Sequence, residues 1–163
     1  MSGASSAAVD YALLTEQLEA LAEGVGERVT NLANAAALLW QTLPALNWAG
    51  FYLARPQGLI LGPFMGKPAC TAIPYGKGVC GAAAATGAVQ RVPDVHLFPG
   101  HIACDAASRS ELVIPLYVGG ALFGVMDLDS PELSRFSEAD AAGLIRFARV
   151  LERALAACAP GTV

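Results

Sequence analysis

Three cysteines of this chain lie in polar or glycine-rich segments. Cys104 lies in HIACDAASRSE, among a histidine, two acids and an arginine. Cys70 ends the segment GKPAC, and Cys80 lies in GKGVCG. Free cysteines are usually buried among apolar side chains, whereas these three have glycine, proline, lysine and histidine as neighbours. We therefore interpret them as candidate reactive thiols.

A reactive thiol needs a lowered pKa, which nearby positive charge or a helix N-terminus provides. His101 and Arg109 flank Cys104 and are candidates for that charge. Lys67 and Lys77 flank the other two cysteines in the same way. The pattern favours redox or nucleophilic chemistry at the three thiols.

Zinc binding is an alternative use of the same residues. Structural zinc sites favour ligand pairs two to four residues apart, whereas the three cysteines are separated by ten and 24 positions, without a CxxC motif. His101 and Cys104 form the only close ligand pair, so we predict no metal. Cys158 lies on the apolar stripe of the last predicted helix, and we assign it no role.

Two aspartates interrupt the apolar run GVMDLDS. Asp127 and Asp129 are two residues apart on a predicted strand, so both side chains point to one face. Aspartate is disfavoured inside strands, and like charges on one face repel each other. Either this face is solvent-exposed, or the pair lines a pocket that binds an ammonium or keeps one acid protonated. A protonated carboxyl beside a thiolate can act as a general acid.

Glu111 can join the two aspartates only if the intervening hairpin is irregular. With an ideal two-residue turn at Gly119-Gly120, Glu111 would lie opposite Leu128 and point to the other face. Pro115 in mid-strand indicates a bulge or an edge position. We predict an irregularity that shifts the register by one residue and brings Glu111 onto the aspartate face.

Composition limits the class of protein. A chain of 163 residues, 55% apolar and 15% charged, fits one compact domain. With 14 acidic and 10 basic residues, the latter scattered, it is not expected to bind nucleic acid. It has neither a secretory signal nor an apolar run of about 20 residues, so we predict a cytoplasmic protein without a membrane partner. Cysteines in that reducing compartment are seldom permanent disulfides.

The apolar periodicity predicts two helices, a hairpin, a loop-rich middle, a second hairpin and a final helix. The expected ranges are 11–21 and 29–43 for the helices, 47–55 with 58–64 and 111–118 with 121–129 for the hairpins, and a last helix from Ser137. Long loops are expected at 65–81 and 94–110, with a short helix after Gly81. This order predicts an α+β fold, with a central antiparallel sheet and the N- and C-terminal helices packed on one face. Residues 1–8 are expected to be a flexible tail, and 9–159 one domain.

Four segments of the chain carry a resemblance to a known family: GKPAC, GKGVCG, VPDVHLFPGHIACDAASRSE and VMDLDSP. Together they resemble the free methionine-(R)-sulfoxide reductases, which are single GAF domains. The resemblance runs from about residue 47 to 136. Ordinary GAF domains share the sheet and helices but lack three cysteines at these spacings.

The resemblance implies a redox cycle. Cys104 corresponds to the catalytic cysteine, which attacks the sulfoxide sulfur and becomes a sulfenic acid. Cys70 corresponds to the principal resolving cysteine, which forms a disulfide with it, and Cys80 to a third cysteine with a secondary resolving or recycling role. Thioredoxin, reduced indirectly by NADPH, would reduce the disulfide, and no bound cofactor is expected.

The resemblance also implies how the substrate is held. Glu111, Asp127 and Asp129 correspond to carboxylates that hold free methionine sulfoxide, and Trp48 to an aromatic wall around its methyl group. Carboxylates that pair with an ammonium would be left unpaired by a peptide nitrogen, which favours the free amino acid. A homodimer through the terminal helices is possible.

Two other functions are compatible with the same fold. One is a non-catalytic GAF module that senses oxidants or binds a small ligand. The other is a zinc-binding regulatory domain. The three cysteines separate the reductase from a ligand-binding module, which does not need them.

Overall fold

The computed structural model describes residues 8–161 and 163, so the tail expected at 1–8 lies almost wholly outside the described residues. The helices are α1 (Tyr11–Ala22), α2 (Arg28–Thr42), α3 (Gly78–Thr86) and α4 (Glu138–Ala157), with a 3-10 turn at Val95–Leu97. The strands are β1 (Trp48–Arg55), β2 (Gly58–Gly66), β3 (Ala72–Pro74), β4 (Gln90–Val92), β5 (Ser110–Val118) and β6 (Ala121–Ser130). None of the described helices has the length and apolar character needed to cross a membrane.

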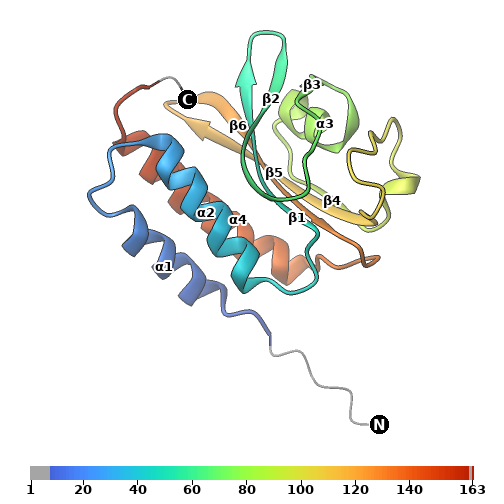
Figure 1. Cartoon of the computed structure of the whole chain (residues 1–163), viewed down its shortest axis with the longest axis horizontal. Coiled ribbons are helices and arrows are strands. Elements are labelled where there is room, and N and C mark those ends of the chain that lie inside the picture. Colours follow the sequence, from blue (N-terminus) through green and yellow to red (C-terminus); the bar gives the residue numbers. More distant parts are fainter. Residues whose placement is uncertain (1–7, 162) are drawn as a thin grey trace.

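The strands form one antiparallel sheet in the order β3-β2-β1-β6-β5-β4. Helices α1, α2 and α4 pack on one face of it, whereas α3 and the loops around it cover the other face (Figure 1). The predicted α+β architecture is therefore confirmed, including the packing of the terminal helices on one face.

Alternating side chains divide β5 and β6 between two environments. Five side chains of these strands are fully buried against the terminal helices: Leu112, Ile114 and Leu116 of β5, and Met126 and Leu128 of β6. Successive residues of a strand point to opposite faces, so the residues between these five point toward α3. Because the helix-covered face holds most of the apolar core, the α3 face can carry polar groups.

The β5–β6 hairpin contains the predicted irregularity. Its register shifts by one residue between Leu116 and Tyr117, close to the mid-strand proline. Glu111 consequently pairs with Asp129 and not with Leu128. The prediction that Glu111 shares a face with the aspartates is confirmed.

The segment 65–81 differs from the long loop expected there, because it contains β3 and the start of α3. The helix begins at Gly78 and not after Gly81. A Cβ on Gly81 would lie 2.6 Å from the carbonyl oxygen of Pro74. This glycine therefore allows close packing inside the helix and does not mark the start of the helix. Cys80 therefore lies on a helix, and its assignment to a loop was wrong.

Gly124 lies in β6 beside the register shift, and a Cβ there would overlap the carbonyl oxygen of Tyr52 in β1. We expect Gly124→Ala to lower the free energy of unfolding by about 1–3 kcal/mol, because two strands would have to move apart. Urea denaturation measures this. Gly26→Ala is the matched control, since no atom lies within 4 Å of its Cβ position. Equal effects in the two variants would contradict the steric explanation.

Candidate active site

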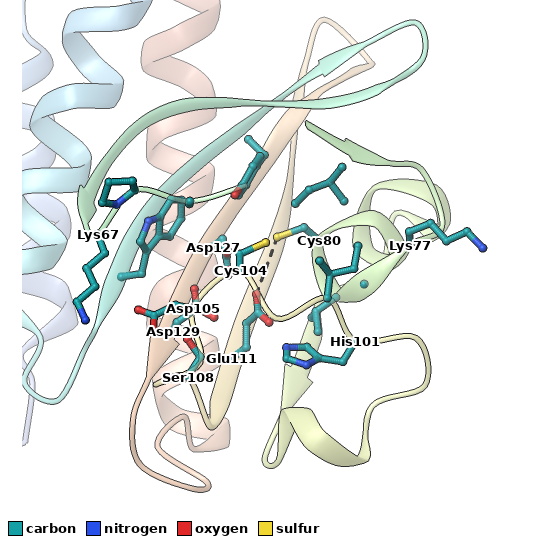
Figure 2. Close-up of a pocket in the computed structure, with 18 residues that line it drawn as sticks. Lys67, Lys77, Cys80, His101, Cys104, Asp105, Ser108, Glu111, Asp127 and Asp129 are labelled. Carbon is teal, nitrogen blue, oxygen red and sulfur yellow. Dashed lines mark hydrogen bonds between the residues drawn. The ribbon is translucent and has the colours of Figure 1, made fainter. Parts of the chain in front are cut away.

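A pocket lies on the α3 face of the sheet, between β1, β5, β6, the first turn of α3 and the loops that follow β2 and precede β5 (Figure 2). Most of the predicted site residues line it: Trp48, Cys80, Cys104, Glu111, Asp127 and Asp129. The remaining one, Cys70, is held beside the pocket by a disulfide bond to Cys104. The structure thus brings together all the predicted site residues from six separate segments.

The disulfide joins the two loop cysteines, with 5.4 Å between their Cα atoms. Both are partly exposed. The loop that carries Cys70 is fixed to the sheet by Tyr52, whose hydroxyl donates a hydrogen bond of 3.0 Å to the Cys70 carbonyl oxygen. A thiol from solvent can therefore reach this disulfide while its surroundings stay ordered.

The loop that carries Cys104 lacks helix and strand and is attached to the sheet through Asn47. The Asn47 amide donates hydrogen bonds to a carboxylate oxygen of Asp105, at 3.0 Å, and to the Ser108 hydroxyl, at 2.9 Å. Asn47 directly precedes Trp48, so one short stretch of chain positions both the loop of Cys104 and the indole ring of Trp48. Sequence reasoning missed this role, because an asparagine before a strand carries no signal for a contact 58 residues away.

Three carboxyl groups are buried side by side in the pocket. Glu111, Asp127 and Asp129 are 6%, 5% and 8% exposed. Burial raises the pKa of all three, and the neighbouring charge of Asp127 raises the pKa of Glu111 and Asp129 further. Hydrogen bonds donated by Glu111, Cys80 and Asp129 oppose the rise in the pKa of Asp127. The pKa of Asp127 is therefore raised less than the pKa values of Glu111 and Asp129.

Two buried polar atoms in this region have no hydrogen-bond partner within the described part of the chain: Oδ1 of Asp127 and Nε1 of Trp48. One is an acceptor and the other a donor. Buried polar groups are normally paired, so both atoms indicate a polar ligand that completes the site.

An aromatic stack forms one wall of the pocket. The Trp48 ring stacks on Tyr52 and Phe64, with centroid distances of 5.7 and 5.2 Å. Trp48 and Tyr52 are four residues apart on β1 and so share a face. That spacing was visible in the sequence and could have identified Tyr52 as a site residue.

The positive charge expected next to Cys104 is not supplied by His101 or Arg109. His101 lines the pocket, but burial and the proximity of His96 lower its pKa, which leaves it largely neutral at pH 7. Arg109 is exposed and is not among the lining residues. Lys77 lies at the rim, with its amine extending away from the sulfur atoms (Figure 2).

The group suited to hold a metal ion among the described residues is not the Cys104–His101 pair considered from the sequence. It consists of Cys80, Glu111 and Asp127, whose ligand atoms lie within 4.8 Å of one another. Metal ligands must be deprotonated, and burial raises the pKa of all three groups. The protonation of this cluster therefore opposes metal binding.

The profile of the GAF domain family matches residues 14–155. A protein named free methionine-R-sulfoxide reductase from Escherichia coli is 51% identical over 146 residues, covering 90% of this chain and 88% of that protein. The chain belongs to the free methionine-(R)-sulfoxide reductases of the GAF family. This confirms the family and the enzyme class predicted from the sequence.

Other free methionine-R-sulfoxide reductases match over most of their length. The one from Saccharomyces cerevisiae is 43% identical over 143 residues, covering 83% of this chain and 79% of that protein. The structure of the reductase from Neisseria meningitidis in complex with its substrate is 44% identical and superposes with a TM-score of 0.86, covering 90% of this chain and 89% of the other. The fold and the enzyme class are thus shared across bacterial and fungal members.

The raised pKa values of the buried carboxyls make stability depend on pH. In the unfolded chain these carboxyls lose their protons above about pH 4, whereas in the folded state they keep them to a higher pH. The free energy of unfolding should therefore fall as the pH rises from about 4 through the pKa values that Glu111 and Asp129 have in the folded protein. Glu111→Gln removes one titrating group, so we expect a shallower fall and a gain on the order of 1 kcal/mol at pH 7. Urea denaturation from pH 5 to 8, with the disulfide intact, measures both effects.

The matched control is Glu19→Gln, on the exposed face of α1. It should leave the free energy of unfolding within about 0.5 kcal/mol at every pH. An unchanged pH dependence in Glu111→Gln would refute the buried, protonated state of Glu111.

Proposed function

We propose that this protein reduces free L-methionine-(R)-sulfoxide to L-methionine, with Cys104 as the nucleophile and Cys70 as the resolving thiol. The observation that carries the proposal is the Cys70–Cys104 disulfide at the edge of a pocket with three buried carboxyl groups. The substrate complexes solved for relatives from Neisseria meningitidis and Staphylococcus aureus support it.

The carboxyl cluster would select a free amino acid. Asp127 has the least raised pKa of the three and an unpaired buried oxygen, so it is suited to accept a hydrogen bond from the substrate ammonium. A peptide nitrogen carries no such charge and would leave that oxygen unpaired, at a cost of about 1–3 kcal/mol or more. Trp48 would pack on the sulfoxide methyl group, as the family resemblance implies.

The chemical step needs a thiolate as the nucleophile and a carboxyl group as the proton donor. The Cys104 thiolate attacks the sulfoxide sulfur, and the oxygen, which is a poor leaving group until protonated, takes a proton from Glu111 or Asp129. The attack forms a sulfur–sulfur bond between Cys104 and the substrate. This bond and the sulfur–oxygen bond of the substrate then break as the hydroxyl group passes to the Cys104 sulfur, so that methionine leaves and Cys104 becomes a sulfenic acid. The enzyme sulfur is oxidised by two electrons and the substrate sulfur is reduced by two.

Resolution and recycling complete the cycle. The Cys70 thiol condenses with the Cys104 sulfenic acid, which releases water and prevents over-oxidation. Thioredoxin would then reduce the partly exposed disulfide by thiol–disulfide exchange, with electrons from NADPH. We propose a cytoplasmic location, where such a reductant is available.

A homodimer through the terminal helices also belongs to this proposal. It is supported by two large apolar side chains on the surface of α1, Leu13 and Leu21, which are 49% and 44% exposed. Light scattering on the purified protein determines the mass in solution.

The decisive assay couples the protein to thioredoxin, thioredoxin reductase and NADPH. We expect NADPH consumption with free methionine-R-sulfoxide and little with the free S epimer or a peptide-blocked R-sulfoxide. Cys104→Ser should abolish turnover because it removes the nucleophile. Addition of EDTA should leave the rate unchanged, since no step uses a metal.

A folded, fully reduced wild-type protein that is silent on all three substrates would overturn the reductase proposal. The cysteines would then belong to a non-catalytic oxidant-sensing or ligand-binding GAF module. Loss of activity with EDTA would instead favour the zinc-binding alternative.

Cys70→Ser tests the resolving role separately. It should still release about one methionine per protein molecule in a single turnover, because Cys104 is intact, and then accumulate a sulfenic acid on Cys104. Dimedone labelling followed by mass spectrometry detects that species. Rapid steady-state turnover by Cys70→Ser with thioredoxin would show that Cys70 is not the principal resolving thiol.

A further inference from the structure

Cys80 differs from the other two site cysteines in position and in partner. It remains a free thiol while Cys70 and Cys104 are joined in a disulfide. It is 4% exposed and lies in the first turn of α3, whereas the disulfide is on partly exposed loops. A thiol from solvent that reaches the disulfide would therefore not reach Cys80.

The Cys80 thiol points at the carboxyl cluster. It donates a hydrogen bond to Oε2 of Glu111, with 3.9 Å between sulfur and oxygen (Figure 2). An oxygen of Asp127 also lies within 4.8 Å of this pair. A protonated thiol can donate to these oxygens, whereas a thiolate would face them as another negative charge.

The titratable groups that face this thiol come from three strands. Glu111 lies on β5, Asp127 and Asp129 on β6, and Tyr52 on β1. Burial raises the pKa of Cys80 well above its ordinary value, and the charges of Asp127 and Glu111 raise it further. A helix N-terminus usually lowers a thiol pKa, but here burial and the acids outweigh it. Since the thiolate is the species that exchanges with disulfides, Cys80 is a poor redox nucleophile.

The backbone around Cys80 is tightly packed. A Cβ on Gly81 would lie 2.6 Å from the Pro74 carbonyl oxygen, and the Gly76 amide donates a hydrogen bond of 2.9 Å to the Gly81 carbonyl oxygen. On the other side, a Cβ on Gly78 would lie 3.3 Å from the Ile102 side chain. The backbone that carries Cys80 is thus held from both sides in the first turn of α3.

We propose that Cys80 is a positioning residue whose protonated thiol donates a hydrogen bond to the Glu111–Asp127 pair, and that it takes no part in the redox cycle. This inference rests on the reductase activity proposed above, and it replaces the secondary resolving or recycling role implied by the family resemblance. By donating to these carboxyls, the thiol orients them toward the substrate and opposes the rise in the pKa of Asp127.

Two substitutions at Cys80 separate the roles. Serine keeps a hydrogen-bond donor and removes the redox sulfur, whereas alanine removes both. We expect Cys80→Ala to lower kcat/KM with free methionine-R-sulfoxide about tenfold, the loss expected for one hydrogen bond in the site. Cys80→Ser should restore most of that loss.

The pH profile adds a readout that a purely structural role would not change. Loss of a donor raises the pKa of the carboxylate that accepted the hydrogen bond. The limb of the kcat/KM profile that reports this acid should therefore move to higher pH in Cys80→Ala and return toward the wild-type position in Cys80→Ser. Cys158→Ala, at a buried cysteine remote from the pocket, is the matched control and should change neither rate nor profile.

Mass spectrometry of the wild-type protein tests the inference without a variant. Thiols are alkylated after each of several turnovers with thioredoxin, and Cys80 should be recovered as a free thiol throughout. A disulfide between Cys80 and another cysteine, or equally severe losses in Cys80→Ser and Cys80→Ala when both are folded, would overturn the inference. If the wild type itself has no turnover, it is the reductase proposal that fails.

Discussion

Burial of three carboxyl groups side by side on the β5–β6 ladder is the constraint on which the rest of this structure depends. Like charges on neighbouring strand positions repel each other, and each carboxyl loses hydration when it is buried. Such a cluster persists only if protons are retained and if apolar burial elsewhere offsets its cost. The opposite face of the same strands provides that burial, because its leucine, isoleucine and methionine side chains are enclosed by α1, α2 and α4. One face of the sheet thus supplies stability and the other supplies the site.

The site divides its tasks between rigid and loop segments. Strands β1, β5 and β6 carry the aromatic wall and the carboxyls, so the groups proposed to bind substrate are fixed by the sheet. Cys70 and Cys104 lie on loops, where the sulfur atoms can meet each other and a reductant. One hydrogen bond from Tyr52 and two from Asn47 attach these loops to the sheet. The two sulfur atoms are therefore held beside the carboxyls although neither cysteine lies on a helix or a strand.

The environment of each cysteine, more than its identity, determines what it can do. Cys70 and Cys104 are partly exposed and joined to each other. Cys80 is buried against acids. Cys158 is buried at the C-terminal end of α4, where its thiol donates to the carbonyl oxygens of Ala154 and Val25. Reactivity follows exposure and thiol pKa, and neither can be read from cysteine spacing alone.

The sequence by itself determined the first two helices, the last helix and the two hairpins, because apolar periodicity and turn residues are local properties of the chain. The residue types in the loops and in β6 identified the candidate site. It also indicated that Glu111 had to share a face with Asp127, since Pro115 in mid-strand signalled an irregular register. Only the tertiary structure decided that Cys80 is a buried helix residue, that His101 is largely neutral, and that Asn47 and Tyr52 hold the redox loops. These properties depend on contacts between residues distant in the chain and on the solvent excluded by them, and no local pattern encodes either.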